Sequence, residues 1–479
     1  MQLVAYGAQD IYLTGNPQIT FFKVVYRRHT NFSMESIKQS INGYSQIYQS
    51  DGNNVNNKAT VTISRNGDLI TSIYVVCNIQ DRVNGVCGDE LVEDVEIEIG
   101  GQRIDKHYKE WNQIWNELTT PVSKCDGYKY MTGSFSNGMV TLDGTRQQSI
   151  HYPLNFWFCR NPGLALPLIA LQYHEVQLKI TWGTLDNIIR NSVYDSTNDD
   201  MVNIMEVWVD YIYLDTDERR RFSQVSHEYL IEQLQVQKEK DMENKEFKLN
   251  LEHPIKEIIW TTPENKPIDD AKIKLNINGH DRFSERTKEY FTLVQPYKHH
   301  TSIPGYNIKE TDNPLMVNAI ENSFSGAVNT ITHEGDDLVI KLSEEISTGI
   351  LTGDIVNILN NNDDVSIGIT QINNIDRSEK KIYIDHNHIP DFSVSNIVIS
   401  VLGRTQGPKS RCSQLKKDIY VYSFCLDPEE HQPSGTCNFS RIDSAKILFD
   451  KLTSISNIYA INYNILRIMS GMGGLAYSS

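Results

Sequence analysis

The sequence contains none of the short motifs that mark the commonest catalytic sites. It has no P-loop, no His-Glu-x-x-His pair and no Gly-x-Ser-x-Gly turn, so it offers no nucleotide, zinc-hydrolase or serine-hydrolase signature. The glycines between Gly471 and Gly474 lack the Lys-Ser/Thr that would reach a phosphate and its magnesium ion. Gly100 and Gly101 follow a strand-like run and predict only a turn. We therefore expect no enzyme, and no catalytic, cofactor-binding or metal-binding residue.

Cysteines and long apolar runs are also scarce. The seven cysteines are odd in number and include no Cys-x-x-Cys pair, whereas a disulfide framework or a structural zinc site requires paired, clustered spacing. We expect reduced thiols. No apolar run reaches about eighteen residues, and the chain starts with mixed polar sequence, so neither a membrane-spanning helix nor a signal peptide is predicted. The cysteines are Cys77, Cys87, Cys125, Cys159, Cys412, Cys425 and Cys437.

Positive charge is in deficit. The formal net charge is −16, whereas a protein that neutralises phosphates over a large surface needs a basic face. We therefore predict no direct, sequence-specific contact with nucleic acid. The start of the chain is locally basic, with Lys23, Arg27, Arg28 and Lys38. It is either an ordinary scatter of charge or an arm that faces something anionic.

Strand-forming patterns dominate what is present. The 479 residues suit two or three domains. Val95, Ile97 and Ile99 alternate with acidic residues, which is the period of a strand with one buried face. Similar short runs, separated by turns rich in Gly, Asn and Asp, predict a β-sandwich or barrel. The runs in the first half are 19–26, 59–64, 69–77, 92–99, 175–182 and 207–214.

One segment of the first half reads as a helix, residues 105–118. Tyr108, Trp111 and Trp115 fall on one face of it. Large aromatics at this spacing are typical of core anchors, and less so of a ligand pocket. The composition changes at 213–234, where charged residues of both signs replace the strand-like runs. Arg219 to Arg221 come directly after acidic residues. This mixed charge favours a solvated connector between domains over a nucleic-acid patch.

A second β series follows the connector and is interrupted. Residues 306–416 are poor in aromatics, rich in Ile, Val, Asn and Asp, and acidic on balance. Their alternating apolar positions predict a small β domain inserted into a loop. The strand-like runs around the insertion are 247–251, 255–260, 272–277, 291–294 and 419–425, and those within it are 338–342, 354–359, 365–370, 381–384 and 396–401.

A few polar clusters could carry chemistry, but each favours a structural reading. Glu429, Glu430 and His431 lie between two prolines, where a turn is the simpler interpretation. The histidine pairs lack a third ligand nearby, and the paired aspartates lack the twelve-residue calcium-loop pattern. These pairs are His299–His300, His386 and His388, Asp269–Asp270, Asp336–Asp337 and Asp363–Asp364.

Three long stretches carry more information than any short motif. They are Ala5 to Phe32, with its Thr14-Gly15-Asn16-Pro17 turn, Asp427 to Asp443, and Asn462 to Tyr477. In order, and spread over almost the whole chain, they closely resemble the major capsid proteins of nucleocytoplasmic large DNA viruses. The Trp111/Trp115 stretch and Val294 to Thr301 extend the resemblance. Residues 306–416 depart from it, because the family pattern passes through this region with far fewer residues.

The resemblance implies an all-β fold of two tandem eight-stranded jelly rolls, with the small β domain inserted in the second. The expected divisions are an N-terminal arm 1–19, a first jelly roll 20–212, a connector 213–234, a second jelly roll 235–305 and 417–465, an exterior insertion 306–416, and a C-terminal tail 466–479.

The resemblance also implies a function. The expected protein is a structural major capsid protein that forms homotrimeric, pseudo-hexagonal capsomers. These tile the icosahedral shell of a large double-stranded DNA virus assembled in the host cytoplasm. Expected partners are neighbouring capsomers, minor capsid proteins on the inner face, and glycans or surface proteins on the insertion. The alternatives are a minor or paralogous capsid protein of the same fold, or a glycan-binding or glycan-processing β-sandwich protein.

Overall fold

The computed structural model describes most of the chain. The described residues are 7–8, 10–24, 28–47, 57–78, 88–133, 149–183, 203–239, 243–263, 268, 271–304, 325–334, 337–343, 346, 354–360, 365–376, 379–385, 397–404, 411–413, 415 and 417–477.

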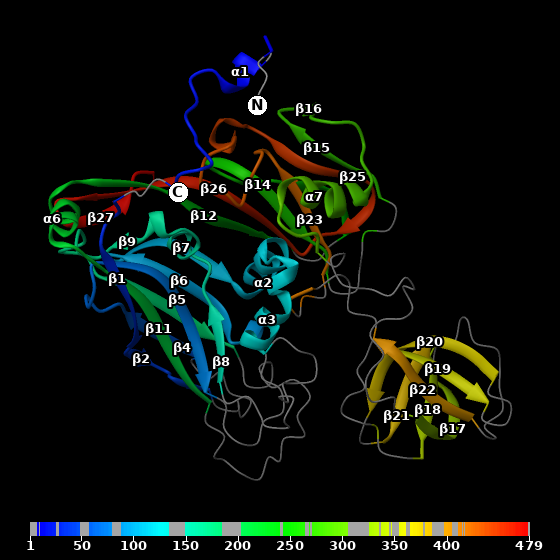
Figure 1. Ribbon diagram of the computed structural model, residues 1–479. Helices are drawn as coiled ribbons and strands as arrows, with labels where there is room; N and C mark the ends of the chain where they lie inside the picture. The colour runs from blue at the N-terminus through cyan, green and yellow to red at the C-terminus, as the bar shows by residue number, and fades with distance from the viewer. Residues whose placement is uncertain are drawn as a thin grey trace, which may run out of the picture.

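Two antiparallel β-sandwiches stand next to each other (Figure 1). In the first, a sheet ordered β1-β11-β5-β8 faces one ordered β2-β4-β10-β6-β7, while β3 pairs with β11 and β9 with β5. The strands are β1 (Phe32–Gln39), β2 (Ile41–Gly43), β3 (Gln46–Ile47), β4 (Lys58–Thr62), β5 (Leu69–Asn78), β6 (Val92–Ile99), β7 (Gln102–Tyr108), β8 (Ser149–Pro153), β9 (Leu166–Pro167), β10 (Val176–Trp182) and β11 (Asn203–Leu214).

The second sandwich is built in the same way. A sheet ordered β12-β26-β14-β23 faces one ordered β13-β25-β15-β16, while β24 pairs with β14 and β27 with β26. The strands are β12 (His227–Lys238), β13 (Glu243–Lys248), β14 (Pro254–Thr261), β15 (Ile273–Ile277), β16 (His280–Asp281), β23 (Ile419–Ser423), β24 (Cys437–Asn438), β25 (Ala445–Ser454), β26 (Asn457–Met469) and β27 (Met472–Leu475).

The two sandwiches share one strand order. The main strands of the first are β1, β4, β5, β6, β7, β8, β10 and β11. Counted along the chain, the first, eighth, third and sixth form one sheet, and the second, seventh, fourth and fifth form the other. The eight main strands of the second sandwich follow the same order; they are β12, β13, β14, β15, β16, β23, β25 and β26. This is the jelly-roll arrangement, in which two sheets share a core and few strand edges stay open. The predicted fold of two tandem jelly rolls is confirmed.

Alternating burial explains why these segments form strands. Val95, Ile97 and Ile99 are fully buried in the first core, while Glu96 on the same strand points away from it. The strand reverses at Gly100 and Gly101, whose backbone φ angles of 58° and 81° favour glycine. The predicted turn is therefore present, and it sets the pairing of β6 with β7.

Helices are short and lie in the connections. The longest are α2 (Lys109–Thr119) and α3 (Val122–Thr132), which occupy the connection between the fifth and sixth strands of the first jelly roll. The others are α1 (Asp10–Thr14), α4 (Trp157–Arg160), α6 (Thr216–Gln224), α7 (Gln295–His299), the 3₁₀ turns η1 (Gly88–Glu90), η2 (Pro162–Leu164) and η4 (Phe439–Arg441), and the π-helical turn η3 (Tyr290–Val294).

The inserted segment forms a closed six-stranded barrel in the order β17-β18-β21-β20-β19-β22. It has its own core, in which Ile340, Ile358, Ile382, Ile384 and Ile399 are fully buried. The five strands predicted here are present, and the sequence reading missed β17. The strands are β17 (Ser325–Glu334), β18 (Asp337–Leu342), β19 (Asp354–Asn360), β20 (Val365–Asp376), β21 (Lys381–Asp385) and β22 (Ile397–Arg404).

Several predicted elements differ in type or extent. Residues 19–24 are exposed and are not a strand, because β-propensity without a partner strand does not form one. Residues 105–108 continue β7, because pairing with β6 outweighs their helical pattern. Residues 291–294 are π-helical, since a short apolar run does not separate helix from strand.

The segments predicted as connector and tail are partly sheet. Within 213–234, helix α6 is followed by β12, which pairs along its whole length with β26. Within 466–479, β26 continues to Met469 and β27 folds back on it. Pairing with neighbouring strands supplies the backbone hydrogen bonds of both segments. This pairing could not be predicted from the local sequence.

Candidate functional site

Two of the candidates come together in the structure, although their sequence positions are far apart. The His300 side chain is fully buried, with Nδ1 2.9 Å from an oxygen of Glu429 and Nε2 2.9 Å from an oxygen of Glu257. Glu429 also accepts a 2.8 Å hydrogen bond from the backbone N–H of Thr301 and one from the Thr301 hydroxyl. Glu257, on β14, was not singled out in the sequence.

The two carboxylates favour a charged imidazole. Burial alone would lower the pKa of His300, but Glu257 and Glu429 outweigh it and raise that pKa to about 9. Burial would raise the pKa of Glu429, yet the hydrogen bonds from His300 and Thr301 hold it below its usual value. With both ring nitrogens occupied, His300 is unsuited to proton transfer. Its role is to hold the loop around Glu429 against β14.

Of the other candidates, those that the structure describes do not join the His300 cluster. His299 Nδ1 bonds the backbone oxygen of Leu426, and neither Glu430 nor His431 joins the His300 cluster. His386, His388, Asp269–Asp270, Asp336 and Asp363–Asp364 lie outside the described residues. Among the residues described, no group of three His, Cys, Asp or Glu side chains is placed to hold a metal ion. In the same part of the chain, no helix is both long and apolar enough to cross a membrane.

Another buried polar cluster lies where the two jelly rolls meet, a region we call the junction. Helix α2 of the first jelly roll packs Trp111 and Trp115 against Ile259 and Tyr459 of the second. The rings of Trp111 and Tyr459 are 5.5 Å apart. Trp111 and Trp115 are 1% and 4% exposed, so the prediction that they are core anchors is confirmed.

A buried charge network crosses the junction. Arg160 of α4 lies 2.8 Å from one oxygen of Glu232 on β12, and Lys256 of β14 lies 2.6 Å from the other. Lys256 is fully buried, and its amine also faces the ring of Tyr463. The guanidinium of Arg160 stacks on the ring of Trp115 at 4.0 Å. Because a buried charge without a partner is costly, the network fixes both sandwiches in one arrangement.

Glu117 of α2 is the most completely enclosed carboxylate of the junction. It is fully buried and accepts hydrogen bonds from the backbone N–H groups of Arg411, Cys412 and Ser413 at 2.6, 2.8 and 2.6 Å. The Ser413 hydroxyl adds a fourth at 2.7 Å. Consecutive N–H groups that converge on one anion form a nest. Residues 411–413, assigned to the insertion by sequence, thus pack in the junction.

The end of α2 is capped by both flanks of the insertion. The last carbonyl groups of a helix have no partner within it. Ser302, just before the insertion, donates through its backbone N–H and its hydroxyl, at 3.0 and 2.8 Å. After the insertion, Arg411 donates through Nη2 at 2.8 Å and Cys412 through its thiol at 3.4 Å. The accepting backbone oxygens belong to Leu118, Thr120, Glu117 and Asn116, respectively.

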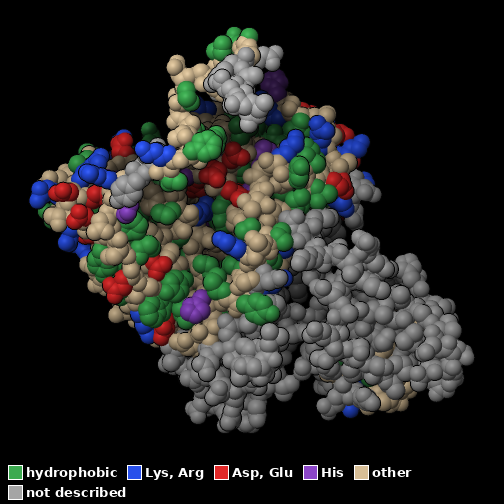
Figure 2. All heavy atoms as spheres, in the orientation of Figure 1, with side chains coloured by type: hydrophobic (Ala, Val, Ile, Leu, Met, Phe, Trp, Pro, Cys, Tyr) green, Lys and Arg blue, Asp and Glu red, His purple; other side chains and the backbone are tan. Residues whose placement is uncertain are grey.

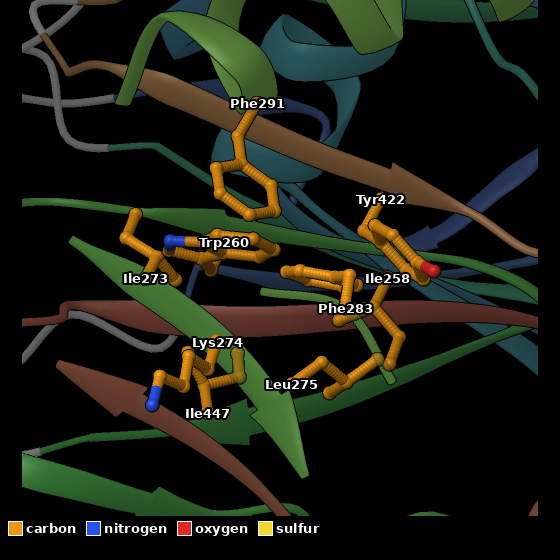
Figure 3. Close-up of a pocket in the computed structure, with 9 residues that line it drawn as sticks. All are labelled: Ile258, Trp260, Ile273, Lys274, Leu275, Phe283, Phe291, Tyr422 and Ile447. Carbon is orange, nitrogen blue, oxygen red and sulfur yellow. The ribbon is translucent and has the colours of Figure 1, made fainter. Parts of the chain in front are cut away.

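Two of the cavities lined by the described residues are poorly suited to a small molecule. Figure 3 shows a space in the second core bordered by Trp260, Phe291 and Phe283, from which the Lys274 amine points away. It holds about 10 Å³, far below a ligand pocket of at least about 300 Å³. A larger groove of about 670 Å³ runs between β7 and β12. Its Asp105 is already bonded to the Leu234 N–H and to His107.

The surface carries apolar side chains that other molecules could cover. Residues 10–24, which take in part of the predicted N-terminal arm 1–19 and which we call the apolar arm, expose the side chains shown in green at the top of Figure 2. A second patch consists of Val294, Tyr297 and Leu426, and a third of Tyr173, Met469 and Met472. Exposed apolar patches are typical of interaction surfaces. The exposed apolar residues of the arm are Ile11, Tyr12, Ile19, Phe21, Phe22 and Val24.

Comparisons with known proteins agree with this architecture. The model of the major capsid protein N-terminus matches residues 20–215, and that of the large eukaryotic DNA virus major capsid protein matches 218–374 and 413–474. The major capsid protein of Pyramimonas orientalis virus is 42% identical over 100% of this chain and 99% of its own. That of Paramecium bursaria Chlorella virus 1 is 36% identical over the same shares. The crystal structure of PBCV-1 VP54 superposes with a TM-score of 0.61 at 31% identity, covering 96% of this chain and all of VP54.

Two jelly rolls in a single chain define the double jelly-roll class of viral capsid proteins. Within that class, the chain belongs to the major capsid proteins of large eukaryotic DNA viruses. One expectation about the family was too broad. The family match continues to residue 374 and leaves out only 375–412 of the inserted region, so the departure from the family pattern is shorter than 306–416.

The His300 cluster predicts a pH dependence of stability. The folded-state pKa of about 9 lies above the ordinary 6.5. The stabilisation, roughly 3 kcal/mol, is therefore complete below about pH 6.5 and is lost as the pH rises through about 9. Urea denaturation at pH 6.5, 8 and 9.5 should show this loss, and His300→Gln should flatten it. An equal pH slope in the variant would contradict this role of His300.

The Glu117 nest predicts a large effect of a small change. Glu117→Gln keeps the shape but turns an amide N–H₂ toward the backbone donors, so the free energy of unfolding should fall by about 2–4 kcal/mol. Glu228→Gln is the matched control, because Glu228 forms an exposed pair with Arg467, and its denaturation midpoint should hardly move. Equal midpoints for the two variants would contradict the assignment.

The flanking contacts also predict where the insertion can be cut. Replacing residues 306–409 with a Gly/Ser linker keeps Arg411 to Ser413 on Glu117 and should leave a soluble, cooperatively folded protein. Replacing 306–416 removes them and leaves a buried carboxylate without partners, so solubility or the denaturation midpoint should fall sharply. Size-exclusion chromatography and urea titration compare the two. Similar behaviour of both deletions would show that these contacts are dispensable.

Proposed function

We propose that this chain is the main shell protein of a large double-stranded DNA virus and acts as a homotrimeric capsomer. The observation that carries the proposal is the repeated strand order of the two jelly rolls. Three chains with two similar sandwiches each place six similar sandwiches around a threefold axis. The capsomer then has a pseudo-hexagonal outline, and such units tile an icosahedral shell.

Contacts between the three copies are heterologous, because a closed threefold ring pairs two different surfaces of each chain. The Tyr297 and Tyr173 patches supply apolar area for such contacts. A stable trimer of this kind buries more than about 2,000 Å² at each interface. Neighbouring capsomers then meet through the remaining, more polar sides.

The N-terminal arm and the inserted barrel indicate the other partners. We place the apolar arm on the inner face of the shell, against minor capsid proteins, and the barrel on the outside, where it meets glycans or surface proteins. The acidic chain makes no sequence-specific contact with the genome and performs no catalysis. Assembly takes place in the host cytoplasm.

The other candidates make different predictions. A minor or paralogous capsid protein has the same fold, and its low abundance in purified particles would reveal it. A glycan hydrolase needs two carboxylates about 5–10 Å apart in an open cleft. In the groove between β7 and β12, Asp105 is engaged by the backbone, which disfavours that reading.

The trimer is tested directly by mass. Native mass spectrometry or sedimentation at micromolar concentration should give about three times the 54.8 kDa of the chain. Because no metal is invoked, the mass should be the same in EDTA. A stable monomer, or dissociation by the chelator, would count against the proposal.

The arm is tested separately from the trimer. Deleting residues 2–15, or making Phe21→Ser with Phe22→Ser, should leave soluble trimers, because these side chains are 90% and 97% exposed. Shell assembly should be impaired in both variants, as measured by particle yield in a co-expression assay. Protease cleavage of the arm in intact, full particles would contradict its inward position.

A further inference from the structure

Two cysteines from distant parts of the sequence lie side by side in the junction. Cys125, on α3, donates from Sγ to the backbone oxygen of Arg411 at 3.0 Å. Cys412, the next residue, donates from its own Sγ to the backbone oxygen of Asn116 on α2. Together with Tyr128 the two cysteines form a small buried cluster, and Cys125 Sγ touches the peptide unit that joins Arg411 to Cys412.

This pair differs from the other buried thiols. Burial raises the pKa of both Cys77 and Cys159 to about 12, so each stays protonated and inert. For Cys125, the neighbouring Cys412 outweighs burial and lowers the pKa, while the pKa of Cys412 is raised. Of the two thiols, Cys125 is therefore the one that loses its proton more readily and can serve as the nucleophile.

We propose that Cys125 and Cys412 are a dithiol that closes to a disulfide after the protein has folded, when its surroundings change from reducing to oxidising. The timing rests on the proposed function, since a virus particle leaves the reducing cytosol for oxidising surroundings. The disulfide ties the segment behind the inserted barrel covalently to the first jelly roll.

A peroxide is the oxidant that this buried site suits, because it is small. Cys125 loses its proton and the resulting thiolate attacks one peroxide oxygen. The O–O bond breaks, Cys125 becomes a sulfenic acid, and the leaving hydroxide takes up the Cys125 proton to form the first water. The Cys412 sulfur then attacks the sulfenic sulfur. Its proton passes to the departing hydroxide, and water is released. Two thiols have lost two electrons and two protons in total, and one hydrogen peroxide has become two water molecules.

Closure acts on the contacts that hold the insertion. Cys412 is the middle residue of the three whose N–H groups bind Glu117. A covalent bond to α3 keeps these donors in place when the rest of the junction opens. The oxidised protein should therefore unfold at a higher temperature than the reduced one, with unchanged mass of the trimer.

The test uses the full-length protein, purified reduced and exposed to a small molar excess of hydrogen peroxide. Remaining thiols are alkylated during acid denaturation, and the digest is mapped by mass spectrometry. The expected result is a Cys125–Cys412 cross-linked peptide and an unfolding midpoint several degrees higher, both reversed by dithiothreitol. Alkylation at both cysteines, stable over-oxidation of Cys125, or pairing of either with another cysteine would overturn the proposal.

Variants distinguish a disulfide between Cys125 and Cys412 from oxidation elsewhere in the protein. Cys125→Ser and Cys412→Ser should each abolish the peroxide-dependent rise in midpoint, whereas Cys437→Ser, a half-buried control, should keep it. If a junction variant folds poorly, the peptide map of the wild-type protein still decides. The trimer mass is recorded on the same samples. Absence of the disulfide in an intact trimer would overturn this proposal alone, whereas absence of the trimer would count against the proposed function.

Discussion

The contact between the two jelly rolls depends on the hydrogen bonds that satisfy one buried carboxylate, that of Glu117. Glu117 has no access to solvent, and its charge is held by three N–H groups and a hydroxyl from Arg411 to Ser413. That requirement draws a segment of the second jelly roll onto a helix of the first. The aromatic contacts of α2 and the Arg160–Glu232–Lys256 network act on the same interface. The two sandwiches are therefore one unit, although each has its own core.

Much of this fold was predictable because a strand with one buried face has a period of two. The strands β5, β6, β10 and β14 follow such runs closely. The sequence could not show that residues 105–108 would extend β7, since pairing partners are set in space and the local pattern also suits a helix. It also could not show that residues 19–24, which have strand-forming side chains, would find no neighbouring strand among the described residues.

The polar sites were less predictable, and for a different reason. His300 and Glu429 both stand out in the sequence, but only beside their neighbours along the chain, His299 and Glu430. Their real partners come from another loop and from β14. Nothing in the composition marks Glu117 or Lys256 as buried, because charged residues usually lie at the surface. Only the family resemblance, which spans the whole chain, pointed to the arrangement that brings them together.

Capping of α2 from both sides of the insertion has a mechanical consequence. Ser302 and residues 411–413 are clamped to the same helix end. A force applied to the barrel therefore does not load the sheets of the second jelly roll first. It is shared in parallel by hydrogen bonds on the neighbouring jelly roll, which must break together rather than one after another. Helix α2 therefore bears the force before it reaches the edge strands of the second jelly roll.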